Sequence, residues 1–328
     1  MPSSSIRYDI VTFGEGLLRF STSRYERLEQ ADTLDIHVAG EALEVAVVMS
    51  RFGLRAAWLS ALTDNALGRK IVNKAREQGV DTSWVQWLKE GRIGLAYTEP
   101  GSAPRASRLT EDREATGFGR ILEGLDWSPL RASRLLHIDS AVPILYPDSI
   151  ASLEAGISEA RDAGCKVSVC VDDAFTVCSE DMRKSVMSIA READIVIITS
   201  ASAECISDGA NALEDQAVFL KEKFGSSVVA VAEGRLPSAR VGTWQGVAAE
   251  NQLFHDRSYD LEVIDAAGAF SAFAGGFLYG YLTEGAGIGL RYGNAAAALS
   301  HSVPGNLLWI TKEEISAQFS GTAAKLQR

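Results

Sequence analysis

Near its C-terminal end the chain reads Val263-Ile-Asp-Ala-Ala-Gly-Ala-Phe-Ser-Ala-Phe-Ala-Gly-Gly-Phe277. From Gly268 onward, apolar and small residues recur without a break, and we expect a helix over residues 268–281. A second segment of the same kind covers residues 288–302. Small side chains let two helices approach closely, so this stretch predicts a tightly packed helical pair.

Upstream of this pair, short apolar runs typical of β-strands alternate with helical patterns. This alternation predicts an α/β fold with a mostly parallel central sheet and helices on both faces. We expect strands over residues 8–14, 56–62, 135–138, 167–171, 195–198 and 228–232. We expect the intervening helices over residues 42–52, 67–78, 150–163, 180–191 and 211–224.

Segments 17–38 and 92–109 interrupt the alternation, because they are more strand-like than helical. We interpret them as insertions in the sheet-and-helix body. The chain shows no internal repeat, low-complexity linker or shift in composition that would mark a second domain. A single domain over residues 1–328 is therefore expected.

The composition of the chain limits the classes of function that it can have. Of 328 residues, 46% are hydrophobic and 23% are charged, which is ordinary for a globular protein. The formal net charge of −11 argues against binding to nucleic acid or to an anionic membrane, since both need a positive surface. The expected partner is therefore a small molecule or another protein.

Cysteine and histidine usage argues against disulfides and zinc. The cysteines Cys165, Cys170, Cys178 and Cys205 lack CxxC spacing, and the four histidines lie far apart in the sequence. We expect reduced thiols, no metal site and a cytoplasmic location. The first residues show no signal-peptide pattern, and no apolar run reaches the length of a membrane span.

The stretch from Val263 to Phe277 resembles the D-x-x-G-A-G-D-A-F-x-x-G-F signature of the ribokinase/PfkB family of sugar kinases. Phe270 stands where that signature has its second glycine, and Ser271 stands where it has the catalytic aspartate. The resemblance extends over nearly the whole chain and is closest to 2-keto-3-deoxygluconate kinases. Its other supporting segments are Val11–Glu15, Tyr25–Asp32, Ala61–Gly68, Tyr292–Leu299 and Pro304-Gly305.

This resemblance implies a ribokinase-like fold in which the two insertions form a small β-lid over the sugar site. It places Gly14 and Gly40 beside the sugar, with Ala39-Gly40 replacing a Gly-Gly pair. It places Glu44 where an asparagine of the family holds sugar hydroxyls. A carboxylate accepts hydrogen bonds but does not donate them, whereas an amide does both.

The resemblance assigns two further positions to the substrate. Asp172 stands at the asparagine of an Asp-x-Asn-x-Arg strand end, and Ala174 replaces the arginine of that motif. Arg113 matches the lid arginine that binds the substrate carboxylate in keto-acid kinases, but Glu111 replaces its tyrosine partner. A solvated lid arginine is the alternative interpretation of Arg113.

The phosphate side of the site follows from the same resemblance. Backbone N–H groups of Gly268, Ala269 and Phe270 would form an anion hole at a helix N-terminus. Ser271 does not act as a base at neutral pH without a partner, and we interpret it as a helix cap. Asp265 is a less favoured substitute base.

Nucleotide binding is expected at Val231, Gly268 and Asn294. The family's metal-organising N-x-x-E motif falls on residues 200–203, with Glu204 one residue late. One residue rotates a helical side chain by about 100°. No protein metal site is therefore expected, and ATP and Mg²⁺ are required only if the protein is active.

Two functional hypotheses remain open. The first is a non-catalytic relative of the sugar kinases that has lost or weakened phosphorylation and acts by binding or regulation. The alternative is an active sugar or sugar-acid kinase with a rearranged site. A third hypothesis, an enzyme of another class, has only Asp172, Asp173 and Glu44 as candidate acids. The resemblance also implies a homodimer formed through the lid.

Overall fold

The computed structural model describes residues 6–23, 25–121, 125–207 and 209–320. The main sheet of this part has the strand order β13-β12-β11-β10-β9-β8-β1-β4-β5, and β14 pairs with β12. The strands from β5 to β11 in this order are all parallel. They are β5 (Val85–Leu88), β4 (Ala56–Thr63), β1 (Ile10–Phe13), β8 (Leu135–Asp139), β9 (Lys166–Val171), β10 (Ile195–Thr199) and β11 (Val228–Ser238).

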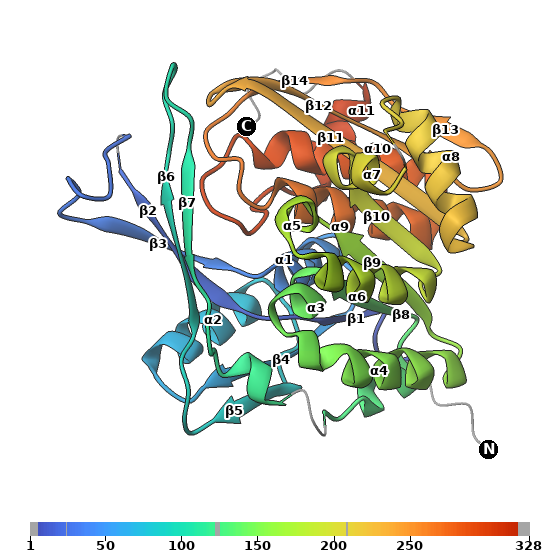
Figure 1. Ribbon diagram of the computed structural model, residues 1–328, viewed down its shortest axis with the longest axis horizontal. Helices are drawn as coiled ribbons and strands as arrows, with labels where there is room; N and C mark the ends of the chain where they lie inside the picture. The colour runs from blue at the N-terminus through green and yellow to red at the C-terminus, as the bar shows by residue number, and fades with distance from the viewer. Residues whose placement is uncertain (1–5, 24, 122–124, 208, 321–328) are drawn as a thin grey trace.

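Helices cover both faces of the sheet (Figure 1). Alternate residues of a strand point to opposite faces, so Ile195 and Ile197 pack into one core, whereas Val196 and Ile198 pack into the other. The first core contains α1 (Glu41–Arg51), α2 (Ala66–Glu77), α9 (Ala269–Glu284) and α10 (Ala286–Ser300). The second contains α4 (Ile150–Asp162), α6 (Glu180–Arg191) and α8 (Leu213–Phe224). These helices and the parallel strands confirm the α/β architecture predicted from the sequence.

Antiparallel strands complete one end of the sheet and were not predicted. Strand β12 (Val241–Ala249) returns from β11 as a hairpin and pairs with β13 (Leu253–His255) and β14 (Tyr259–Glu262). Strand β14 and the first half of β12 alternate buried with less buried positions, so they lack the continuous apolar run of the central strands. The remaining helices are short: α3 (Ala141–Leu145), α5 (Ala174–Val177), α7 (Ser200–Ile206) and α11 (Lys312–Ser320).

A second sheet of four strands stands beside the main body (Figure 1). Its order is β3-β2-β6-β7, from β2 (Leu17–Thr22), β3 (Leu34–Ala39), β6 (Gly94–Glu99) and β7 (Arg108–Asp112). These are the two segments that the sequence marked as insertions, although β7 continues beyond the predicted limit at residue 109. We call this sheet the lid.

The helical pair α9 and α10 packs closely, as its small residues predicted. A Cβ at Gly276 would lie 2.7 Å from the carbonyl oxygen of Tyr292, and one at Gly280 would lie 2.6 Å from the Cα of Gly289.

All four cysteines are free thiols. Within the described ranges, no helix is both long and apolar enough to cross a membrane.

Candidate functional site

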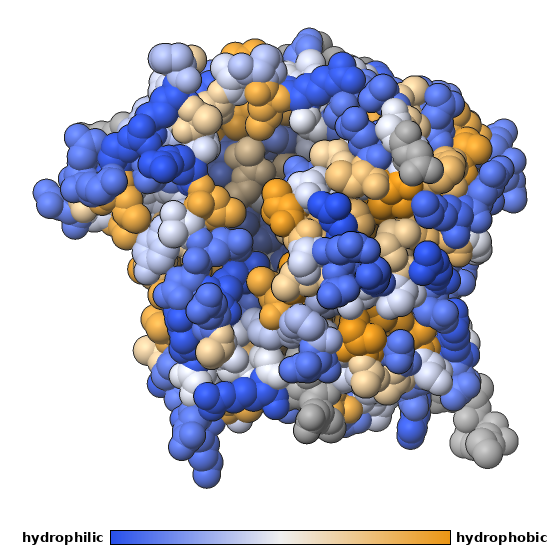
Figure 2. Space-filling model, viewed as in Figure 1, coloured by the Kyte–Doolittle hydropathy of each residue, from blue (hydrophilic) through white to orange (hydrophobic). Residues whose placement is uncertain are grey.

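A cavity of about 1360 Å³ lies where the lid meets the N-termini of α1 and α9. Figure 2 shows the surface hollowed between the lid and the body of the molecule. Its lining residues come from segments far apart in the chain. Among them are Glu15, Arg19, Gly40, Glu41, Glu44, Arg113, Asp139, Asp172, Asp265, Gly268, Ala269, Phe270, Ser271 and Asn306.

The first wall of this cavity is the N-terminus of α1. Gly40 has φ +135°, and a Cβ there would lie 2.2 Å from the carbonyl oxygen of Glu15, so this turn requires glycine. Glu44, one turn later, is buried with its carboxylate at the base of the cavity. It accepts hydrogen bonds from the Gly40 N–H and the Asn306 amide (both 3.0 Å) and from Ser271. Burial raises the pKa of Glu44 despite these bonds.

The second wall is the N-terminus of α9. Gly268 caps this helix in the left-handed conformation (φ +77°), and no side chain caps it. The interpretation of Ser271 as a helix cap is therefore wrong: Ser271 lies two residues inside the helix and contacts Glu44 instead. Helix geometry leaves the first N–H groups of α9 without a partner in the helix, on a segment that lines the cavity.

Phe270 occupies the second position of α9 with ordinary helical backbone. Only Gly268 in this turn has a positive φ, so the fold accepts a side chain at residue 270 without backbone strain. The Phe270 ring packs partly against the core and also lines the cavity. The ring therefore lines the cavity at the start of α9 without distorting the helix.

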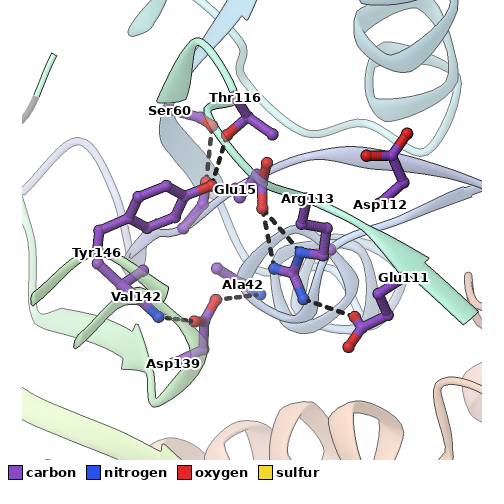
Figure 3. A network of polar contacts seen from close by, with 12 residues as sticks. Glu15, Ala42, Ser60, Glu111, Asp112, Arg113, Thr116, Asp139, Val142 and Tyr146 are labelled. Atoms are coloured by element: carbon purple, nitrogen blue, oxygen red, sulfur yellow. Dashed lines mark hydrogen bonds and ion pairs between the residues drawn. The ribbon is translucent and has the colours of Figure 1, made fainter. Parts of the chain in front are cut away.

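Arg113, the candidate carboxylate-binding arginine, is held by carboxylates of the protein itself. Figure 3 shows its guanidinium between Glu15 and Glu111. Its Nε and one terminal nitrogen donate to Glu15 (3.0 and 2.9 Å), and the other terminal nitrogen donates to Glu111 (3.1 Å). The pair with Glu15 is nearly buried, which argues against a solvated lid arginine. Glu15 was not predicted as a site residue.

Arg19 was not predicted as a site residue either, although it joins the lid to the start of α9. This buried arginine of β2 forms an ion pair with Asp265 (2.5 Å) and donates to Asn306 (2.7 Å). Asp265 also accepts from the backbone N–H groups of Gly305 and Ala267 (both 3.0 Å). With its oxygens committed in this way, Asp265 is a structural residue. The only sequence signal for Arg19 is a charged residue within an otherwise uncharged strand.

Three further carboxyls lie close together on the floor of the cavity. Asp139 accepts from the backbone N–H groups of Ala42 and Val142 (Figure 3), and burial raises its pKa to about 7. Burial also raises the pKa of Asp172, which accepts from the Ser140 hydroxyl (3.0 Å). The pKa of Glu41 is raised well above its usual value by burial, then by Asp172 and Asp139.

Several predicted site residues lie outside this cavity. Gly14 is buried against the body, and a Cβ there would lie 2.3 Å from Asp139 Oδ2. Val231 is inside the sheet and Asn294 is inside the helical layer, both with no exposed surface and neither lining the cavity. Glu204 is exposed and also lies outside it. Local sequence placed these residues on the correct elements, but how deeply each is buried depends on how the elements pack together.

Among the described residues, no group of three or more histidine, cysteine, aspartate or glutamate side chains is arranged to hold a metal ion.

Comparison with protein families decides the origin of this site. Residues 7–308 match the family profile described as "pfkB family carbohydrate kinase". The chain belongs to the pfkB family of carbohydrate kinases. This membership confirms the resemblance seen in the sequence, and the ribokinase-like fold follows with it.

Two curated members illustrate how far the similarity extends. The chain is 28% identical over 323 residues to a 2-dehydro-3-deoxygalactonokinase of Haloferax volcanii, covering 98% of this chain and 99% of that protein. It is 27% identical over 303 residues to a 5-dehydro-2-deoxygluconokinase of Shouchella clausii, covering 89% of each.

A solved pfkB structure shows the same fold. The 2-dehydro-3-deoxygluconokinase of Thermotoga maritima superposes with a TM-score of 0.89 at 27% identity, covering 95% of this chain and 99% of that one. Likeness over this length includes the lid as well as the body of the molecule.

Proposed function

We propose that this pfkB protein is an active kinase that transfers the γ-phosphoryl group of MgATP to a hydroxyl of a small sugar acid. One observation carries the proposal: the uncapped N-terminus of α9 lines the same cavity as the lid arginine Arg113 and the carboxylate Glu44. Phosphoryl transfer requires an anion-binding end and a sugar-binding end in one closed space. The non-catalytic hypothesis is thus replaced by its alternative as the main proposal.

The substrate class is proposed from the relatives and from the donors of Arg113. The relatives described above carry the names of kinases for 2-dehydro-3-deoxygalactonate, 5-dehydro-2-deoxygluconate and 2-dehydro-3-deoxygluconate. A guanidinium has five N–H donors. Glu15 and Glu111 engage three of them in Arg113, so two stay available for a substrate carboxylate.

The phosphate end is proposed from the N-terminus of α9. Backbone N–H groups of the first turn and the positive end of the helix dipole favour an anion there. Gly268 keeps this turn open, because only glycine fits both its backbone angle and its contact with the Asn306 carbonyl (2.2 Å from a Cβ). Charge that develops on the γ-phosphoryl group is stabilised at such a site without reorganisation.

A binding protein without catalysis is the second candidate function. It is favoured by Ser271 at the position of the family's catalytic aspartate. It is also favoured by the ion pairs that Arg113 already forms with Glu15 and Glu111, which leave fewer of its N–H groups for a substrate. A ligand of this protein would bind in the same cavity but would not be phosphorylated.

A coupled ADP-release assay tests the proposal. The purified chain is supplied with MgATP and, in turn, 2-dehydro-3-deoxygluconate, 2-dehydro-3-deoxygalactonate and 5-dehydro-2-deoxygluconate, with the product identified by mass. We expect turnover of at least about 1 s⁻¹ with one of them, the low end for typical enzymes. D-fructose, which lacks a carboxylate, is the matched control. Sugar acids that raise the melting temperature without any turnover would favour the binding protein.

A further inference from the structure

The catalytic aspartate of the family signature is absent, yet a carboxylate lies next to its position. Ser271 is on α9 and Glu44 is on α1, 227 positions apart by their residue numbers (271 − 44), and their side chains form a hydrogen bond. Both residues are almost fully buried and both line the cavity. The exchange of aspartate for serine on one helix is thus accompanied by an acidic residue on the facing helix.

We propose that Glu44 is the general base of this kinase and that it accepts the proton of the substrate hydroxyl in place of the missing aspartate. This assignment rests on the proposed function. It moves the base from α9 to α1 while the position of the reacting hydroxyl stays between the two helices. Ser271 is a positioning residue that orients the Glu44 carboxylate.

The proton and electron balance of the step is simple. The substrate O–H proton passes to a carboxylate oxygen of Glu44, and the hydroxyl oxygen forms a bond to the γ-phosphorus of ATP. The bond from that phosphorus to the β–γ bridging oxygen breaks, and ADP leaves with the electron pair. Protonated Glu44 then returns its proton to water when the product leaves.

The hydrogen bonds of Glu44 leave room for this role. A carboxylate has about four lone-pair positions. Gly40 and Asn306 both donate to Oε1, and Ser271 donates to the carboxylate as well. One acceptor position therefore stays open on a carboxylate that lines the cavity, and three donors hold this carboxylate in place.

Charge explains why serine suits residue 271. An aspartate there would place a second carboxylate in contact with Glu44, and like charges at this distance oppose ionisation of one of them. Serine instead donates a hydrogen bond and leaves one ionised carboxylate beside the reacting hydroxyl. Burial raises the pKa of Glu44, which strengthens it as a base.

Other carboxyls of the cavity are less suited to this step. Asp265 is fully engaged by Arg19 and by backbone N–H groups. Glu41 lies near Asp172 and Asp139, whose charges raise its pKa after burial, whereas it is Glu44 that contacts Ser271. Asp139 accepts from the backbone N–H groups of Ala42 and Val142, whereas Glu44 accepts from Ser271 on α9.

The test compares Glu44→Gln with the wild-type full chain in the ADP-release assay. Glutamine preserves size and burial but does not accept the proton, so kcat is expected to fall by about 10² to 10⁴, with KM changed far less. The control is Glu222→Gln, the same change at an exposed position of α8 outside the cavity. Glu44→Gln/Ser271→Asp returns a carboxylate to α9 and is expected to recover at least about tenfold of the lost kcat.

The pH dependence provides a readout that a structural role would not give. A base works when deprotonated, so wild-type kcat is expected to fall with decreasing pH through the raised pKa of Glu44, and Glu44→Gln removes this limb. The groups that face Glu44 are unchanged in this comparison: Glu41 on α1, Arg19 on β2 with its partner Asp265, and the neutral Ser271 and Asn306.

The outcomes separate this assignment from the proposed function. An active wild type whose Glu44→Gln variant keeps kcat within about threefold overturns the assignment and leaves the kinase in place. A wild type without turnover on any sugar acid overturns both. If Glu44→Gln does not fold, the dependence of wild-type kcat on pH decides. A kcat that stays constant down to about pH 4, the usual range of glutamic acid, overturns the assignment.

Discussion

Asp139 accepts hydrogen bonds from two backbone N–H groups in a buried position, and its pKa is raised to about 7. Its unfolded value is about 3.9. The native state thus binds more protons than the unfolded state between these values, and stability contributed by the protonated group is lost as pH rises from about 4 to about 7.

The direction of this pH dependence of stability gives the first prediction. Between about pH 5 and about pH 8, the melting temperature of the wild type should fall by more than that of Asp139→Asn, which does not titrate. The variant itself should be less stable at low pH, because an amide nitrogen faces one of the backbone donors, a loss of about 1–3 kcal/mol. Calorimetric melting curves measure both effects. Equal pH slopes in the two proteins would contradict the raised pKa.

The ion pair of Arg19 with Asp265 supports a second prediction. Their side chains are 4% and 15% exposed, so Asp265→Asn leaves a buried charge without its partner. We expect a loss of about 3–5 kcal/mol in the free energy of unfolding. The matched control is Asp64→Asn, whose partner Arg69 forms an exposed pair (58% and 56%) that contributes about 0–1 kcal/mol. Urea unfolding compares the two, and similar losses would show that the buried pair is not structural.

At the scale of elements, the start of α9 depends on one glycine. Gly268 combines a positive φ with a position where a Cβ would lie 2.2 Å from the carbonyl oxygen of Asn306. Gly225, at the end of α8, has a similar φ (+70°) but open space around it. The two positions therefore separate backbone strain from steric contact.

The third prediction follows from this difference. Gly225→Ala should cost about 1–2 kcal/mol, the cost of a left-handed residue with a Cβ. Gly268→Ala should cost more, because the start of α9 or the Asn306 loop must also move. Denaturant unfolding measures the stabilities, and calorimetry with ATP should show weaker binding only for Gly268→Ala. An equal loss in the free energy of unfolding at both positions would mean that the loop at Asn306 moves aside without an energetic cost.

For the whole molecule, the lid presents apolar side chains to solvent. Ile36 on β3 is 48% exposed. It pairs with Phe20 of β2, whose ring stacks on Tyr97 of β6 on the same face of the sheet. Exposed apolar residues on one small sheet are typical of an interaction site. We propose that they pair two copies of the chain through their lids.

The fourth prediction tests this pairing. The wild type should sediment as a dimer, and Ile36→Asp should sediment as a monomer, since burying a charge in an apolar interface is costly. Val218→Asp, at a 44% exposed position of α8, is the control and should leave the mass unchanged. A monomeric wild type at micromolar concentration would exclude the lid dimer.

Local sequence determined most of the elements of this protein. Apolar runs marked the parallel strands because those strands are buried on both faces. The predicted helices 42–52 and 67–78 are followed by Gly53 and Gly79, and both glycines have positive φ in the structure. The stretch from Val263 to Phe277 predicted both the family and the tight helical pair. The antiparallel strand β12 was missed because its alternation of buried and less buried positions is weaker than an apolar run.

Only the tertiary structure decided which residues of the site contact one another. Glu15 lies 98 residues from its partner Arg113, and Asp265 lies 246 residues from its partner Arg19, so no local pattern relates either pair. The same holds for Glu44 and Ser271, which looked like two separate losses in the sequence and form one hydrogen-bonded pair in the fold. Depth is also a tertiary property: Asn294 was placed on the correct helix, but packing of α10 against the sheet leaves it no exposed surface. Sequence periodicity reports which face of an element is apolar, whereas contacts between elements depend on how the whole chain closes.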